Sequence, residues 1–277
     1  MRSGLIIEGG GMRGFFSAGI LQVITEHNLE FPYAIGISSG SLNLLAFALD
    51  MNIDATSLFD PADGSFLRLR HLVAPGRGLL DTDRFFDQLP SLYPSLQDVS
   101  PEWQIAAVHA ESASMHFWSL ASIDNGEELR DRIRASASIP VLMPRSIIEG
   151  EVYVDGGIVQ SIPVRKALDD GVDKLVIILT RMKGYVKGRQ PMDPYLRSWL
   201  KPYPKLKQMI QTRHLRYNET LRNIDQLEAE GKAFVFRPNI QRLKRMRYDA
   251  NKAMYTFSDG KEIAQRRIDE LKEFLGL

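Results

Sequence analysis

Apolar residues recur along the chain in two alternating patterns, which predict strands and helices in turn. Short apolar runs are typical of buried strands, whereas apolar residues spaced three or four positions apart form one face of a helix. The strand pattern occurs at residues 5–7, 33–37, 103–109, 115–121, 152–154, 174–179 and 233–236. The helical pattern occurs at residues 15–27, 42–51, 82–89, 126–136, 164–170, 193–230 and 261–275. This alternation predicts an α/β fold, a three-layer α/β/α sandwich with a mainly parallel central sheet.

The chain has 277 residues, a length that a single α/β domain can reach. No internal repeat or linker divides it, so we expect one domain over residues 1–277. Its motif-bearing core covers about residues 3–180, and a mainly helical extension follows over about 181–277. Residues 52–80 are rich in aspartate, glycine and proline and predict a long connection, such as a lid or an insertion.

The composition excludes several classes of site and of segment. The chain has no cysteine, which rules out disulfides, thiolate nucleophiles and cysteine-based zinc or iron–sulfur sites. The apolar run at the N-terminus is too short for a signal peptide. No stretch approaches the roughly 18 apolar residues of a membrane-spanning helix. We therefore expect a cytoplasmic protein.

The net charge of +1 hides an asymmetry between the two halves of the chain. Residues 1–150 carry ten arginines, no lysine and 18 acidic residues, whereas residues 151–277 carry 25 basic and 16 acidic residues. The basic half suggests an anionic partner, with a membrane surface or nucleic acid as the usual candidates. A solvated helical surface without such a partner would account for the same pattern.

A glycine-rich run, GGGMRG from Gly9 to Gly14, lies between the first predicted strand and the helix that follows it. Consecutive glycines expose backbone N–H groups, which at the start of a helix bind a phosphate or a developing oxyanion. The spacing of Gly9, Gly11 and Gly14 also matches the G-x-G-x-x-G of dinucleotide-binding folds. That interpretation requires an acidic residue at the end of the second strand, whereas Glu30 precedes the strand.

The pentapeptide GISSG, from Gly36 to Gly40, follows the second predicted strand and precedes a predicted helix. In that context G-x-S-x-G is typical of a nucleophile elbow, in which the flanking glycines let a serine hydroxyl project from a strained turn. The helix would add N–H donors for an anionic intermediate. The pattern therefore predicts that Ser38 is a nucleophile, and the alternative is that it caps the helix.

A serine nucleophile requires a base, and Asp155 is the candidate. It follows the predicted strand 152–154 and precedes two glycines, which would permit close approach to Ser38. The alternative is that Asp-Gly-Gly is only a turn. An α/β-hydrolase triad runs serine, acid, histidine, and only His214 follows Asp155. We predict packing or surface positions for all the histidines, which are His27, His71, His109, His116 and His214.

Together the three motifs resemble those of the patatin-like phospholipase family. In that family a G-G-G-x-R-G loop supplies the oxyanion hole, the serine of G-x-S-x-G is the nucleophile, and the aspartate of D-G-G or D-G-A is the base. The chain has all three motifs in that order. The small-residue stretch from Ala135 to Pro140 matches a fourth family feature. The resemblance covers about residues 3–180.

The resemblance implies a patatin-like fold and a Ser38–Asp155 dyad that hydrolyses fatty-acyl esters, such as phospholipids or lysophospholipids, without a catalytic histidine, a cofactor or a metal. Asp155 would accept the Ser38 proton, and an acyl-enzyme would form and then be hydrolysed. Arg13 would either stabilise charge directly or brace the loop. The oxyanion hole would come from Gly9, Gly10, Gly11, Met12, Arg13 and Gly14, and the elbow and turn glycines would be Gly36, Gly40, Gly156 and Gly157.

Two rival functions stay open beside hydrolysis. A nucleotide-binding oxidoreductase would use the glycine loop at residues 9–14, but it leaves Ser38 and Asp155 unexplained. A non-catalytic lipid-binding protein would keep the fold, but the intact serine and aspartate argue against it.

The basic residues of the C-terminal half suggest where a lipid partner would lie. Residues 181–222 contain eleven basic and two acidic residues with aromatic residues between them, and further arginines and lysines follow up to residue 252. Cationic and interfacial aromatic residues together predict peripheral docking of the 181–252 region on anionic membrane. We expect no nucleic-acid partner, because no recognisable binding motif accompanies the basic residues.

Overall fold

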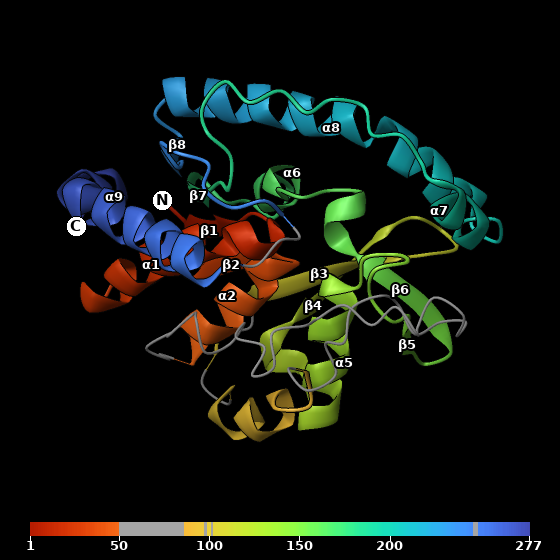
Figure 1. Ribbon diagram of the computed structural model, residues 1–277. Coiled ribbons are helices and arrows are strands. Elements are labelled where there is room, and N and C mark those ends of the chain that lie inside the picture. Colours follow the sequence, from red (N-terminus) through yellow and green to blue (C-terminus); the bar gives the residue numbers. More distant parts are fainter. Residues whose placement is uncertain (50–85, 97–98, 101, 246–248) are drawn as a thin grey trace.

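The structure, a computed structural model, describes residues 1–49, 86–96, 99–100, 102–245 and 249–277. Figure 1 shows a central sheet between two layers of helices, which confirms the predicted three-layer α/β/α arrangement. The strands follow the order β5-β6-β3-β2-β1-β7-β8, and β4 pairs with β3 in addition. Pairing is parallel between β1 (Ser3–Ile7), β2 (Tyr33–Ile37), β3 (Trp103–His109), β7 (Lys174–Ile178) and β8 (Ala233–Phe236). Pairing is antiparallel where β4 (Met115–Ser119), β5 (Ser146–Ile148) and β6 (Glu151–Asp155) join.

The helices cover the two faces of the sheet (Figure 1). One face carries α1 (Gly14–Glu26), α2 (Ser39–Ala48), α5 (Gly126–Ala137) and α9 (Ala250–Leu275). The other face carries α6 (Val164–Asp169) and α8 (Pro204–Ala229), with α7 (Pro194–Trp199) beyond the sheet. The short 3-10 helices are η1 (Gly11–Arg13), η3 (Leu89–Leu96), η4 (Leu120–Ser122) and η5 (Gly156–Ile158).

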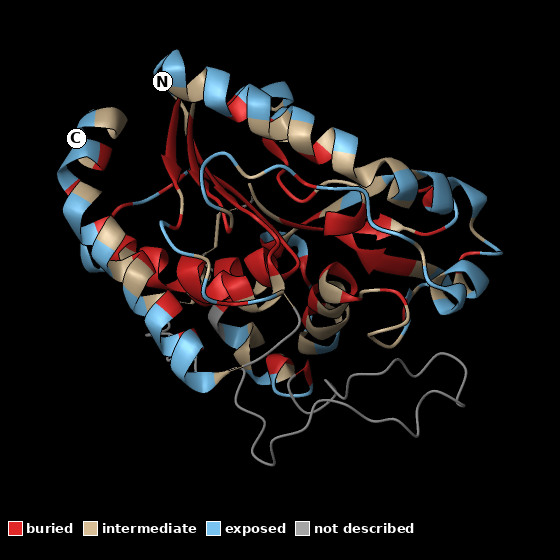
Figure 2. Ribbon diagram, turned by 45° about the horizontal axis from the view of Figure 1, so that its top comes forward, coloured by how far each residue is buried: buried red, intermediate tan, exposed pale blue. Residues whose placement is uncertain are grey.

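Strand β1 shows why a buried parallel strand reads as a continuous apolar run. Its side chains alternate between the two faces, so Leu5 and Ile7 pack in the core beneath α1 while Ile6 packs in the core beneath α8. Figure 2 shows the sheet buried along its length, with exposed residues on the outer sides of the helices.

Several helix bounds differ from those predicted. Helix α2 begins at Ser39 rather than at residue 42, because a single residue turns the chain after β2. The predicted helix 193–230 is two helices, since Pro202 and Pro204 interrupt it. Helix α9 begins at Ala250 rather than at residue 261. Strand β5 was not predicted, and the predicted connection 52–80 and most of the helix 82–89 lie outside the described residues.

Helix α9 lies directly against α1, so that the C-terminal part of the chain packs on its N-terminal part. A Cβ atom added to Gly260 would lie 2.2 Å from the carbonyl oxygen of Phe16, and one added to Gly19 would lie 2.1 Å from that of Phe257. The two helix backbones therefore touch. Glycine is unfavourable inside a helix, and here the close approach explains its presence.

We expect Gly260→Ala to lower the free energy of unfolding by about 1–3 kcal/mol, because the added methyl group overpacks the contact with α1. This is the net loss that remains after the gain of about 1 kcal/mol that alanine brings to a helix interior, because the added methyl group would meet a backbone carbonyl of α1. Urea unfolding measures the change, with Ser258→Ala on the exposed side of α9 as the matched control. Equal stability of Gly260→Ala and the wild type would contradict the close contact.

Candidate active site

One edge of strand β3 brings two chain segments together. Strand β4 pairs with β3 from Gln104 to Val108 and so overlaps the parts of β3 that pair with β2 and with β6. Strands β2 and β6 must therefore share the opposite edge. Strand β2 runs parallel to β3, and its last residue Ile37 lies opposite Ala106. Strand β6 runs antiparallel to β3, and its last residue Asp155 lies opposite Ala107. The two strands therefore end at neighbouring positions.

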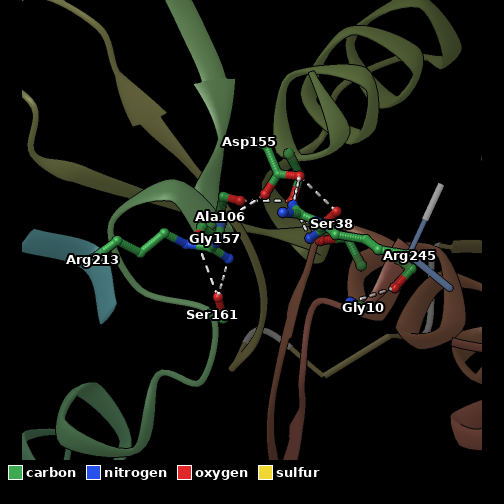
Figure 3. A network of polar contacts seen from close by, with 11 residues as sticks. Gly10, Ser38, Ala106, Asp155, Gly157, Ser161, Arg213 and Arg245 are labelled. Carbon is green, nitrogen blue, oxygen red and sulfur yellow. Dashed lines mark hydrogen bonds and ion pairs between the residues drawn. The ribbon is translucent and has the colours of Figure 1, made fainter. Parts of the chain in front are cut away.

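Ser38 follows β2 directly and meets Asp155 at this junction (Figure 3). The Ser38 hydroxyl donates a hydrogen bond of 2.9 Å to Asp155 Oδ2, and both side chains are buried. The other carboxylate oxygen, Oδ1, accepts the backbone N–H of Gly157 at 2.7 Å. The Asp155 N–H donates to the carbonyl of Ser138 at 2.8 Å. These bonds fix the carboxylate with one oxygen directed at the serine.

The backbone of Ser38 has a strained conformation. Its φ is +56° and its ψ is −122°, a region that residues with a side chain rarely adopt. Helix α2 begins at the next residue, so the hydroxyl lies beside the N-terminus of a helix. This is the strand–turn–helix geometry of a nucleophile elbow.

Ser136 holds the elbow in place. Its hydroxyl accepts the Ser38 N–H at 3.0 Å and donates to the carbonyl of Ala106 at 2.6 Å. It also lies 2.7 Å from the hydroxyl of Ser41, which donates to the carbonyl of Gly36. The small-residue stretch noticed in the sequence therefore contributes a buried hydroxyl that connects α5, β3 and the turn after β2.

The glycine loop between β1 and α1 lies beside Ser38. A Cβ atom added to Gly9 would lie 3.1 Å from Ser38 Cβ. Gly11 has a φ of +57°, and an added Cβ would lie 2.4 Å from the carbonyl oxygen of Arg245, so a side chain does not fit there. The loop continues through η1 into α1 without an intervening turn.

Most N–H groups of this loop already have partners. Gly9 donates to the carbonyl of Ser161 at 3.2 Å, and Gly10 donates to the hydroxyl of Ser39 at 2.9 Å. Within the described residues, the N–H of Gly11 is the one in the loop that has no acceptor. The remaining three donors are Met12, bonded to the carbonyl of Arg245, Arg13, bonded to that of Gly10, and Gly14, bonded to those of Gly11 and Met12.

Arg13 is buried and takes part in a polar network beneath the loop. Its Nε donates to the hydroxyl of Thr180 at 3.3 Å. The Thr180 hydroxyl donates to Glu8, whose other oxygen accepts the Tyr217 hydroxyl at 2.6 Å. Burial lowers the pKa of Arg13 to about 10, which leaves it charged at neutral pH. The contacts of Arg13 thus brace the loop against β7 and α8.

The four elbow and turn glycines surround the same junction. Gly36 lies in β2 and Gly40 in the first turn of α2, while Gly156 and Gly157 begin η5 directly after Asp155. All four are buried.

Two arginines from the C-terminal part of the chain reach this site, and no sequence motif marks either of them (Figure 3). Arg245 Nη2 lies 3.4 Å from Asp155 Oδ2, the oxygen that accepts the Ser38 hydroxyl. Arg213, on α8, donates from Nε to the carbonyl of Gly157 at 2.5 Å and from Nη2 to the hydroxyl of Ser161 at 3.0 Å. Burial and the neighbouring Arg245 lower the pKa of Arg213 to about 10.

The histidines lie elsewhere or make other contacts. Of the four in the described ranges, none has a hydrogen bond to Ser38 or Asp155, and His71 lies outside those ranges. His109, for example, bonds to Ser112 and Glu151. The part of the chain that the structure describes also contains no cluster of three histidine or acidic side chains that could hold a metal ion.

Two family models match the chain in different segments. A model described as Patatin-like phospholipase matches residues 5–168, which include all three motifs and the junction of β2 with β6. A model described as a domain of unknown function, DUF6363, matches residues 203–276, which include α8, β8 and α9. Both arginines of the site, Arg213 and Arg245, lie in the second segment.

Similar proteins come from bacteria and fungi. The chain is 29% identical over 198 residues to the uncharacterized protein YjjU of Escherichia coli, covering 65% of this chain and 52% of YjjU. It is 25% identical over 194 residues to lysophospholipase NTE1 of Kluyveromyces lactis, covering 69% of this chain and 13% of that protein. The chain therefore spans about half, or less, of the length of these relatives.

The fold has a counterpart among solved structures. The crystal structure of VipD from Legionella pneumophila superposes with a TM-score of 0.51 at 12% identity, covering 97% of this chain and 67% of that one. This similarity shows a shared fold alone. The Patatin-like phospholipase model, in contrast, matches more than half of the chain in sequence. The protein belongs to the patatin-like phospholipase family.

Proposed function

We propose that this protein is a serine acyl-ester hydrolase that releases fatty acids from lipid esters through a Ser38–Asp155 dyad. The observation that carries the proposal is the 2.9 Å hydrogen bond between a buried aspartate and a serine held at a strained elbow. Family membership and the similarity to a lysophospholipase support a lipid ester as substrate.

The dyad suffices for both halves of an ester hydrolysis. Asp155 takes the Ser38 proton as Oγ attacks the ester carbonyl carbon, and the tetrahedral intermediate collapses with loss of the alcohol, which leaves with that proton. The acyl group now forms an ester with Ser38. Asp155 next takes a proton from water, which attacks the acyl carbon, and Ser38 regains the proton as the fatty acid is released.

The N–H of Gly11 is the donor that we assign to the oxyanion among the loop residues 9–14, because it is the one without an acceptor within the described residues. The N–H of Ser39, the first residue of α2, also has no acceptor within the described residues and is the second donor of the proposal. Loss of one such donor costs about 100- to 1,000-fold in turnover.

The loop argues against the nucleotide-binding alternative. A pyrophosphate held at a glycine-rich loop needs several free backbone N–H groups. Here the N–H groups of Gly10 and Met12 are already bonded to Ser39 and Arg245. The Ser38 side chain also occupies the space beside Gly9, where an added Cβ atom would lie 3.1 Å from Ser38 Cβ. A non-catalytic lipid-binding role would not explain the strained backbone at Ser38, because such strain is typical of active sites.

Peripheral contact with an anionic membrane through the 181–252 region is part of the same proposal. Lys183, Val186 and Tyr195 are well exposed in this region and combine charge with apolar surface. Several of its other basic residues are used inside the protein, as Arg216 is by its hydrogen bonds to the carbonyls of Val159 and Met209. None of the helices in the described ranges is long and apolar enough to span a bilayer.

Turnover of a water-soluble ester tests the dyad. We expect Ser38→Ala and Asp155→Asn each to lower kcat/KM for p-nitrophenyl butyrate by about 1,000-fold or more, because nucleophile and base act as one unit. His109→Gln is the matched control and should keep wild-type activity, because the His109 ring bonds to Ser112 and Glu151 and not to the dyad. Wild-type turnover by Ser38→Ala would exclude Ser38 as the nucleophile.

The strain at Ser38 predicts that glycine is tolerated better than alanine at this position. We expect Ser38→Gly to be more stable than Ser38→Ala by about 1 kcal/mol, because glycine adopts the left-handed conformation without strain. Both variants lack the hydroxyl and its bond to Asp155, so their difference isolates the backbone. Urea unfolding of the pair gives the value, and a Ser38→Ala protein as stable as Ser38→Gly would show that the elbow is unstrained.

A further inference from the structure

A small cavity of about 130 Å³ opens beside the dyad, and basic side chains line it. Lys187 comes from the segment between β7 and α7, which runs along α8 in Figure 1 and is bonded to Asn218 at both its N–H and its carbonyl. Arg213 comes from α8, and Arg245 from the segment between β8 and α9. The remaining wall is largely apolar and includes Ile139, Pro140, Ile158, Met192, Leu196 and Ile210.

The cavity is adjacent to the reacting groups. Arg245 contacts the Asp155 carboxylate at 3.4 Å, and Arg213 is bonded to the carbonyl of Gly157, two residues after Asp155. Ile139 follows Ser138, whose carbonyl accepts the Asp155 N–H. A ligand in the cavity would therefore lie beside the ester carbon that Ser38 attacks.

The lysine of this cavity has no carboxylate of its own. Lys187 is only 9% exposed, and its ammonium group has no hydrogen-bond acceptor or ion pair within the described residues. The ammonium nitrogen lies 4.2 Å from the centre of the Tyr217 ring, and this cation–π contact offsets only part of the cost of burying the charge. Arg213 donates to two uncharged acceptors.

The carboxylates close to the cavity are already engaged. Asp155 accepts the Ser38 hydroxyl, and Glu8 accepts Thr180 and Tyr217. A cation buried without a counter-charge is costly, and a ligand oxyanion would remove that cost by supplying charge and acceptors together. In agreement with this deficit, burial and then the neighbouring Arg213 lower the pKa of Lys187 to about 7.

We propose that Lys187, Arg213 and Arg245 form a pocket that binds the phosphate group of the acyl-ester substrate. The enzyme would therefore prefer anionic lipid esters to neutral ones. This inference rests on the proposed hydrolase function and adds to it the charge of the substrate. The apolar wall formed by Ile158, Met192 and Ile210 can contact the carbon atoms of the substrate that lie between the phosphate and the ester.

A matched pair of lipids tests the preference. A lysophosphatidylglycerol and a monoacylglycerol with the same acyl chain differ by one phosphoglycerol group, which carries a single negative charge. We expect a kcat/KM ratio of about ten or more in favour of the anionic ester. We expect Lys187→Met to reduce that ratio by about tenfold, because a hydrogen bond to a charged group is lost. Lys272→Met, in the last turn of α9 and outside the 181–252 region, should keep the wild-type ratio.

The outcomes separate this proposal from the proposed function. Equal use of both lipids by the wild type, or a ratio that Lys187→Met leaves unchanged in a folded protein, overturns the pocket while ester hydrolysis stands. Glycerol 3-phosphate that inhibits monoacylglycerol hydrolysis competitively supports the pocket. Purely non-competitive inhibition overturns it, because the phosphate would then bind away from the substrate. Absence of turnover with p-nitrophenyl butyrate as well as with both lipids overturns the proposed function itself.

The preference should also depend on pH. Lys187 is protonated below its pKa of about 7 and neutral above it, so the ratio for the phosphodiester should fall as the pH rises from 6 to 8. The groups that face the lysine are Arg13, Arg213 and Arg245, Glu8, the rings of Tyr185 and Tyr217, and His214 across the cavity. Lys187→Arg should flatten the dependence and His214→Gln should keep it. A dependence that disappears only in His214→Gln would contradict the assignment.

Discussion

Strand β3 offers one edge to two strands that approach each other from opposite ends, and the active-site geometry depends on that arrangement. Strand β2 ends opposite Ala106 and β6 ends opposite Ala107, so the residues at the two ends meet without a long loop. Because each strand is held by backbone pairing, Ser38 and Asp155 are positioned by the sheet rather than by flexible segments. A shift in register of either strand would separate them.

The C-terminal part of the chain contributes both to the fold and to the site of Ser38 and Asp155. It adds β8 to the sheet and lays α9 against α1, with backbone contact at Gly19 and Gly260. From this anchored segment Arg245 reaches Asp155 and accepts the Met12 N–H at its carbonyl. We infer that residues 203–276, which match a domain of unknown function, contribute directly to the site of Ser38 and Asp155. Part of the basic excess of the C-terminal half is therefore buried inside the protein.

The sequence predicts local features better than it predicts their partners. The GISSG and DGG motifs are enough to select Ser38 and Asp155 as candidates, because the strand and the turn next to each motif are predicted from neighbouring residues alone. The loop at residues 9–14 is located by its glycines, but which of its N–H groups are bonded depends on Ser39 and Arg245, which are distant in sequence. Lys187 and Arg213 look like ordinary surface residues of a basic helical region, and only tertiary packing buries them. The role of Gly260 is equally invisible in the sequence, because it depends on the contact of α9 with α1.

The most direct test of the account is the rate at which a fluorophosphonate probe modifies the protein, with the adduct located by mass spectrometry. The probe reacts with a serine only when a neighbouring base activates it. We expect a single adduct on Ser38 in the wild type, with a rate that falls by orders of magnitude in Asp155→Asn. A folded wild-type protein without an adduct, or labelling that Asp155→Asn leaves unchanged, would contradict the dyad.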